Sequence, residues 1–228
     1  MNKLIIAAGT GFLGQSLINH FQDKFEEIII LTRGNNRTIG TLKYVNWNAK
    51  SFSGWESELE NATVLINLTG KSVDCRYTEK NKKEILLSRI QSTKILNKAV
   101  LNCKNPPKHW LNSSTSTIYR FSLDKQMDEA DGEIGNDFSI NVALSWEKSF
   151  FKTETPNTLK TALRTSIVLG KNGGAFIPLK TLAKLGFGGK QGKGNQFISW
   201  IHEEDFANAI DFIIQKEITG VINIVSPE

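Results

Sequence analysis

The chain of 228 residues is 39% hydrophobic and carries a formal net charge of +5. This length and composition allow one sizeable buried core and exclude general disorder. No apolar run reaches membrane-spanning length, and Cys75 and Cys103 lack metal or redox spacing, so we expect a cytoplasmic protein with no membrane segment.

Short apolar segments alternate with amphipathic ones from the first residues onward. The first segment, "KLIIAA", predicts a buried strand, and a helix follows over 12–23 with Leu13, Leu17 and Phe21 on one face. Further strands are predicted at 27–33, 41–47, 62–70, 108–115, 159–170 and 221–225. Further helices are predicted at 78–102, with Leu86, Ile90, Leu96 and Val100 facing inward, at 137–152, and from near Glu203.

This alternation predicts an α/β fold with a doubly wound parallel sheet covered on both faces, in three layers. No internal repeat or Pro/Ser-rich linker divides the chain, so we expect one structural unit. Residues 1–170 would form its nucleotide-binding part, and 171–228 the last sheet elements with a small C-terminal substrate lobe.

The positive charge is concentrated in two stretches. Residues 71–108 hold ten Lys/Arg and three acids, which fits the solvated face of a helix better than a nucleic-acid surface. Residues 155–202 hold seven Lys/Arg and no acid, which would suit a small anionic ligand, with chance asymmetry as the alternative.

Three glycines connect the first predicted strand to the first predicted helix. The spacing Gly9-x-Gly11-x-x-Gly14 permits a tight turn, close backbone approach and a diphosphate at the helix N-terminus. The alternative is a glycine turn without a ligand. A strand, a glycine loop, a helix and a second strand in this order favour a dinucleotide site.

The end of the second predicted strand indicates which dinucleotide is bound. An NAD site usually presents a carboxylate there, but this chain has none in "LTRGNNRT". Arg33 and Arg37 are placed to meet a 2′-phosphate instead. We therefore expect NADP(H), although either arginine could be an ordinary surface cation.

Several motifs in this order resemble the extended short-chain dehydrogenase/reductase superfamily, and within it an NADP-binding, epimerase-like group of sugar-nucleotide epimerase homologues. The first glycine of the usual superfamily pattern is replaced by Ala8. The motifs are "GTGFLG" (9–14), "INLTGKSV" (66–73), "ILLSRIQSTKIL" (85–96), "SWEK" (145–148), "RTSIVLGKNGGAF" (164–176), "GGKQGKGNQFISWIHEED" (188–205) and "GVINIVSPE" (220–228).

The resemblance implies a set of cofactor contacts. The loop contributes Gly9, Thr10, Gly11, Phe12, Leu13 and Gly14, and later segments contribute Thr32, Arg33, Leu68, Thr69, Gly70, Glu84 and Arg89. Arg89 could instead belong to the basic, solvated face of the helix predicted at 78–102.

The resemblance also implies a catalytic hydroxyl at Thr115, next to a Tyr-x-x-x-Lys pair that moves the proton. That pair is absent, because Ser139 and Ala143 stand at the expected positions. Tyr119 lies close along the chain and could substitute as the acid, although superfamily members commonly have a tyrosine at this position that does not serve as the acid. Strong dehydrogenase activity is therefore doubtful.

On the substrate side, the candidates are Arg164, Gln196, Trp200 and His202. Arg164 could instead pair with Asp205 or Glu147, and His202 could simply enter a helix. No histidine or cysteine spacing predicts a metal site. The chain ends where family members continue for several tens of residues, so we expect a truncated or shortened lobe.

Two functions remain open. The first is an NADP(H)-dependent epimerase or oxidoreductase acting on a small polar molecule, such as a sugar nucleotide or another phosphorylated compound. The second is an NADP(H)-binding sensor or interaction protein without turnover. Neither involves nucleic acid or a membrane, and the superfamily resemblance implies a possible homodimer.

Overall fold

The computed structural model describes residues 2–190 and 192–227. Its main sheet has eight strands in the order β11-β7-β6-β5-β1-β2-β4-β3. All of them run parallel except β3, which pairs antiparallel with β4. Their bounds are β1 Lys3–Ala7, β2 Glu27–Thr32, β3 Arg37–Ile39, β4 Leu42–Asn46, β5 Val64–Asn67, β6 His109–Thr115, β7 Leu159–Thr165 and β11 Gly220–Ile224.

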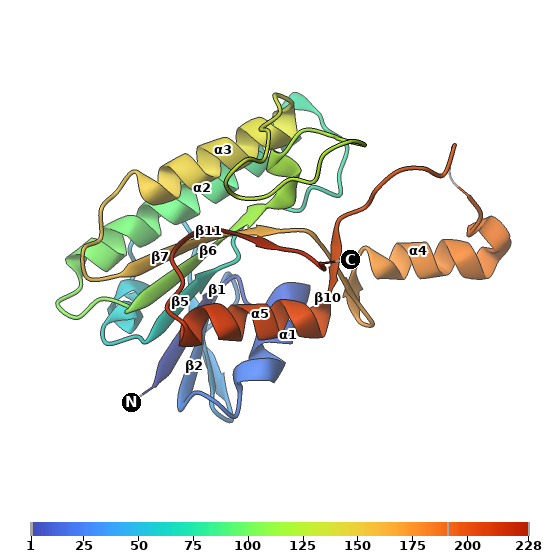
Figure 1. Cartoon of the computed structure of the whole chain (residues 1–228). Helices are drawn as coiled ribbons and strands as arrows, with labels where there is room; N and C mark the ends of the chain where they lie inside the picture. The colour runs from blue at the N-terminus through green and yellow to red at the C-terminus, as the bar shows by residue number, and fades with distance from the viewer. Residues whose placement is uncertain (1, 191, 228) are drawn as a thin grey trace.

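Helices cover both faces of this sheet (Figure 1). One core lies beneath α1 (Phe12–Phe21) and α5 (Glu203–Gln215), the other beneath α2 (Glu79–Asn102) and α3 (Phe138–Phe151). In β1, Leu4 and Ile6 belong to the first core, whereas Ile5 and Ala7 belong to the second, because side chains of a strand alternate between faces. The predicted three-layer, doubly wound α/β fold is confirmed.

The order of the strands reverses direction at β1. The chain passes from β1 to β2 through α1, and from β5 to β6 through α2 on the opposite face. In such sheets a crevice opens where the connections diverge, at the carboxyl ends of the strands. The fold therefore places a crevice at the ends of β1 and β5.

The prediction of one strand over 159–170 is wrong. The chain leaves the main sheet at Ser166, whose N–H and hydroxyl both donate to the Ile224 carbonyl, at 3.0 and 2.9 Å. It continues into a second sheet ordered β10-β8-β9, formed by β8 Ile167–Gly170, β9 Gly173–Gly174 and β10 Trp200–His202. Next to this sheet, α4 (Phe176–Leu182) and the π-helical turn η3 (Ala183–Phe187) project from the body (Figure 1).

The buried face of α2 also differs from the prediction. Leu96 and Val100 are buried, but Leu86 and Ile90 are only half-buried. Small polar residues of α2 are buried against α3, where Thr93 Oγ1 accepts from Trp146 Nε1 at 3.0 Å. Hydrogen bonding rather than apolar contact sets this part of the interface. Within the described ranges, no helix is long and apolar enough to cross a bilayer.

Candidate functional site

The glycine loop has the geometry of an anion-binding turn. Gly11 is the N-cap of α1, and a Cβ there would meet nothing within 4 Å. A Cβ at Gly14 would lie 2.3 Å from the Gly9 carbonyl oxygen, so only glycine lets α1 pack this close to the loop. Open space thus lies over the free N–H groups and positive dipole of the α1 N-terminus.

Ala8, at the start of this loop, adopts a φ of 62°. This left-handed region costs an L-residue roughly 1–2 kcal/mol and costs glycine little. We therefore expect Ala8→Gly to raise the free energy of unfolding by about 1 kcal/mol, after the extra chain entropy of glycine is subtracted. Urea denaturation followed by circular dichroism measures this change.

The matched control is Ala209→Gly in α5, a helical position where glycine should lower the free energy of unfolding by about 1 kcal/mol. Destabilisation by both substitutions would contradict the strain at Ala8.

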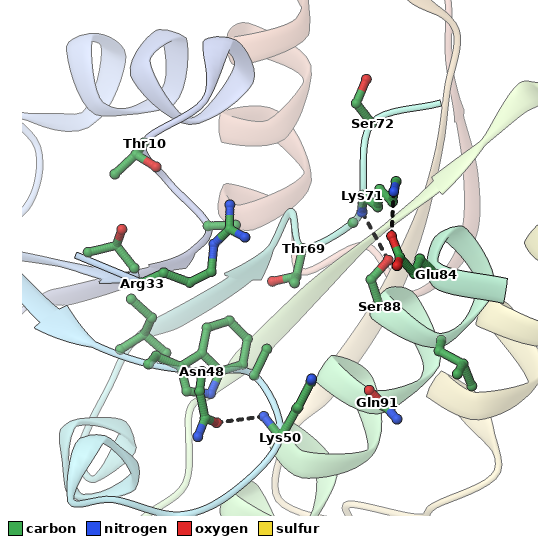
Figure 2. A pocket seen from close by; sticks show the side chains of 17 residues that line it. Thr10, Arg33, Asn48, Lys50, Thr69, Lys71, Ser72, Glu84, Ser88 and Gln91 are labelled. Carbon is green, nitrogen blue, oxygen red and sulfur yellow. Dashed lines mark hydrogen bonds and ion pairs between the residues drawn. The ribbon is translucent and has the colours of Figure 1, made fainter. Parts of the chain in front are cut away.

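A cavity of about 700 Å³ lies beside the glycine loop (Figure 2). It is lined by the segments that follow β1, β2, β4 and β5 and by the first half of α2. These are the strand ends at which the sheet order predicts a ligand crevice. Of the cofactor contacts expected from the sequence, the residues that line it are Thr10, Thr32, Arg33, Thr69, Gly70 and Glu84.

The remaining expected contacts lie outside this lining. The three loop glycines shape the turn, as described above. Phe12, Leu13 and Leu68 pack against the core beneath α1 and α5. Arg89 lies behind the β5–α2 loop, where a Cβ at Gly70 would meet its guanidinium carbon at 3.0 Å.

Arg33 provides the positive charge of the cavity on the β2 side. Figure 2 shows its side chain directed into the cavity, and its guanidinium makes no ion pair with any residue that the structure describes. Arg37 behaves differently: its guanidinium carbon lies 4.0 Å from the centroid of the Tyr44 ring, and it does not line the cavity. Of the two candidate arginines, only Arg33 faces the space that a ligand would fill.

Two polar atoms in the cavity lining lack partners among the described residues. Thr69 Oγ1 and Trp47 Nε1 are buried without a hydrogen bond, and Trp47 as a whole is 2% exposed. Leaving such a group unpaired costs about 1–3 kcal/mol. A ligand in the cavity (Figure 2) can supply a partner to the Thr69 hydroxyl, whereas Trp47 packs on Trp55 in the core.

The opposite wall carries an ion pair between Lys71 and Glu84 (Figure 2). The hydrogen bond from Lys71 and its charge lower the pKa of Glu84, which keeps this carboxylate ionised. Arg89 Nη1 donates to the Lys71 carbonyl at 3.1 Å, and burial lowers the pKa of the Arg89 guanidinium. The net charge contributed by the Lys71–Glu84 pair is zero, so the net positive charge of the cavity lining comes from Arg33 and Lys50.

Thr115 stands at the carboxyl end of β6 and caps η2 (Ser116–Ile118). Its hydroxyl lies 3.0 Å from that of Thr117 and accepts from the Thr117 N–H at 3.2 Å. Ser139 and Ala143 lie on α3, and Ala143 is fully buried. Neither position therefore offers the phenol or the amine that the superfamily pair uses to move a proton.

Tyr119 and Arg164, which were predicted on the catalytic and substrate sides, contact each other. Tyr119 Oη accepts from Arg164 Nη1 at 2.7 Å and donates to Asn223 Oδ1 at 2.9 Å. Arg164 also donates twice to Glu147, each time at 2.9 Å, and Glu147 Oε1 accepts from Ser114 at 2.6 Å. Of the two carboxylates considered for Arg164, the structure therefore selects Glu147.

This network is buried: the Arg164 and Glu147 side chains are 10% and 11% exposed. Burial by itself lowers the pKa of Arg164, but the hydrogen bonds to Glu147 and Tyr119 outweigh it, so the pKa lies above its usual value. Arg164 therefore remains charged over the physiological pH range, and the phenol of Tyr119 both donates and accepts a hydrogen bond within this network.

The other substrate candidates lie at the small sheet. Trp200 is in β10 with its side chain partly exposed, and His202 is the N-cap of α5, where Nδ1 accepts from the Glu204 N–H at 3.3 Å. Gln196 lies in the exposed segment before β10. None of the three lines the cavity. In the described ranges, no group of three or more His, Cys, Asp or Glu side chains could hold a metal ion.

The sequence analysis missed a set of cavity residues, namely Trp47, Lys50, Lys71, Ser88 and Gln91. Trp47 and Lys50 could have been predicted from the sequence. They follow β4, and a parallel strand next to β2 must end at the same edge of the sheet. Lys71 directly follows the predicted contacts in the β5–α2 loop. Ser88 and Gln91 carry no such signal in a helix with many polar residues.

Comparison with known proteins finds relatives whose sequences match over the whole chain. The chain is 35% identical over 233 residues to an epimerase family protein of Staphylococcus aureus, and the match covers 100% of this chain and 76% of that protein. It is 33% identical over 229 residues to an epimerase family protein of Staphylococcus saprophyticus, with the same coverage. No family model matches the chain.

Two solved structures are similar in both fold and sequence. The human epimerase family protein SDR39U1 (isoform 2), crystallised with NADPH, has a TM-score of 0.84 and 27% identity, over 99% of this chain and 75% of that one. A nucleoside-diphosphate sugar epimerase from Corynebacterium glutamicum has a TM-score of 0.83 and 26% identity, over 100% of this chain and 47% of that one.

Proposed function

This chain belongs to the family of the staphylococcal epimerase family proteins, and from that premise we propose that it binds NADP(H) and acts on a small polar substrate. The observation that carries the proposal is the cavity at the ends of β1 and β5, with a glycine loop beside it and, on one wall, an Arg33 that forms no ion pair with any described residue. The human relative with NADPH supports the choice of coenzyme.

The residues present fit a dinucleotide. The α1 N-terminus and the open space at Gly11 would receive a diphosphate, and Arg33 would pair with the 2′-phosphate. Thr69 Oγ1 would gain a hydrogen-bond partner, which it lacks among the described residues. No carboxylate follows β2 to repel a phosphate there, since Gly34, Asn35 and Asn36 come after Arg33.

The chemistry that a nicotinamide coenzyme supplies is hydride transfer. This chain would contribute the Thr115 hydroxyl, which can hydrogen-bond to the oxygen of a substrate carbonyl or alcohol. It offers no Tyr-x-x-x-Lys pair, and losing one general acid typically costs about 10²–10⁴-fold in rate. We therefore propose slow epimerase or oxidoreductase chemistry, with the proton exchanged through water or the substrate itself.

A second function is favoured by the position of Tyr119. Because its phenol already donates to Asn223 and accepts from Arg164, it is occupied in a structural network. If water and the substrate do not take over this proton transfer, the protein would bind the coenzyme without turnover, as a sensor of its redox state.

Coenzyme binding is tested by thermal unfolding with NADPH or NADH. A ligand at 100 times its dissociation constant adds about 2.7 kcal/mol to the stability, or roughly 5–10 °C in Tm for a chain of this length. We expect NADPH to give a shift of this size and NADH a clearly smaller one. Equal shifts would contradict the NADP preference, and no shift at millimolar concentrations would contradict binding.

Turnover is tested by following nicotinamide absorbance with NADPH and a panel of aldehydes, ketones and sugar nucleotides. Slow oxidation with any member supports the enzyme. Because an epimerase returns its coenzyme to the starting redox state, the sugar nucleotides are also incubated with NADP⁺ and checked by NMR for inversion at a carbon centre. Tight NADPH binding with neither oxidation nor inversion across the panel would favour the sensor.

A further inference from the structure

Lys71, in the loop between β5 and α2, is tied to α2 through each of its polar groups. Its N–H donates to Ser88 Oγ at 2.9 Å, and its carbonyl accepts from Arg89 Nη1 at 3.1 Å. Its ammonium forms an ion pair with Glu84 and donates to Asn81 Oδ1 at 2.9 Å. A loop residue of this kind would otherwise be free to rotate, so these bonds fix both its backbone and its side chain.

Arg89 supports the same loop from behind. Besides the Lys71 carbonyl, its Nη1 donates to the Ile85 carbonyl at 3.0 Å, and its guanidinium carbon lies 5.0 Å from the centroid of the Trp146 ring. A Cβ at Gly70 would lie 3.0 Å from that carbon, so the guanidinium is in contact with the loop backbone. The side chain is thus held between α3 and the loop, and it directs donors at Lys71.

The loop held in this way is one wall of the cavity. Thr69, Gly70, Lys71 and Ser72 all line it, facing the wall that carries Arg33 (Figure 2). The unpartnered Thr69 Oγ1 belongs to this loop wall. A site functions only when its groups are held within about half an ångström of the productive geometry, so the position of this wall matters to any ligand.

We propose that Lys71 is a positioning residue of the coenzyme site. Its ion pair with Glu84 and its hydrogen bonds with Ser88 and Arg89 hold residues 69–72 at the distance from Arg33 that a bound dinucleotide requires. Glu84 and Arg89 then act on the ligand through Lys71. This inference rests on the proposed function, because it concerns the geometry of the NADP(H) site.

The test measures NADPH dissociation constants for Lys71→Met, Glu84→Gln and the double variant, by isothermal titration calorimetry. Each single variant should bind NADPH about 10-fold more weakly, and the double variant should bind it as weakly as each single variant, because all three break one linkage. Lys71→Arg, which preserves the ion pair, should retain affinity within about threefold. Hydrogen exchange of the amides of residues 69–72, without ligand, should become faster in Lys71→Met.

The matched control is the Lys82–Glu79 pair, a 2.9 Å contact on the same helix that does not line the cavity. Lys82→Met and Glu79→Gln should leave NADPH affinity unchanged. The Lys71–Glu84 pair is partly exposed, with side chains 30% and 45% accessible, so the unliganded variants should stay folded, with Tm values within about 2 °C of the wild type.

Three results would overturn the proposal. Unchanged affinity in Lys71→Met is the first. Recovery of affinity in the double variant is the second, because it would show that a bare Glu84 carboxylate merely repels the phosphates. Unchanged exchange at residues 69–72 is the third. Failure of the wild-type protein to bind NADPH would instead refute the proposed function, so the two failures are distinguishable.

Discussion

Arg33→Gln is expected to weaken NADPH binding by about 100-fold while changing NADH binding by less than about threefold. A charge-assisted contact between a guanidinium and a phosphate contributes roughly 1.5–3 kcal/mol, and each 1.4 kcal/mol corresponds to a factor of ten in affinity. Only NADPH carries the 2′-phosphate, so the loss should appear in the ratio of the two dissociation constants. Calorimetric titration of both coenzymes measures it.

We expect a large effect because the Arg33 guanidinium has no competing ion pair among the described residues. Its side chain lies in the cavity and makes no ion pair in the described parts of the chain, so no internal partner competes with the ligand. The Lys71–Glu84 pair on the opposite wall is already neutral. Lys50, which also lines the cavity, could retain part of the attraction, and this limits the loss.

Arg37→Gln is the matched control, because it removes the same charge four residues away. Its guanidinium stacks on Tyr44 and does not line the cavity. We expect its NADPH affinity to stay within about twofold to threefold of the wild type, since its exposed guanidinium makes no contact inside the cavity and its charge is weakened by water and salt. An equal loss in both variants would show that the effect is a general reduction of positive charge rather than a contact with the 2′-phosphate.

The sequence was sufficient to predict a crevice at the ends of β1 and β5 because its determinants are local. The spacing of Gly9, Gly11 and Gly14 requires backbone proximity, and the structure shows a 2.3 Å conflict for any Cβ at Gly14. The strand ends follow from the apolar pattern, so Thr32, Arg33 and Thr69 could be placed at one edge of the sheet. These features follow from the order of the strands and the periodicity of the apolar residues, both of which can be read directly from a sequence.

Features that depend on contacts between distant segments could not be predicted in this way. The end of β7 is determined by Ser166 bonding to Ile224, 58 residues away. On α2, hydrophobic periodicity favoured Leu86 and Ile90, but the tertiary fold buries Thr93 and its neighbours, which hydrogen-bond to α3. A polar residue buried for its hydrogen bond looks like a surface residue in a hydropathy pattern.

The buried Arg164–Glu147 pair leads to the prediction with the largest effect on stability. Arg164→Met should lower the free energy of unfolding by about 3–5 kcal/mol, because it leaves the Glu147 carboxylate buried with Ser114 as its remaining donor. The double variant Arg164→Met/Glu147→Leu should lose much less, since it removes both buried charges together. Urea denaturation of the wild type, both single variants and the double variant forms a complete double-mutant cycle.

The control is the exposed pair of the same residue types, Arg120 and Glu133, whose side chains are 36% and 46% accessible. Arg120→Met should lower the free energy of unfolding far less than Arg164→Met, because water and Lys125 still solvate and pair with the carboxylate that remains. If the Arg164→Met/Glu147→Leu variant were as unstable as Arg164→Met alone, lost packing rather than an uncompensated charge would explain the cost.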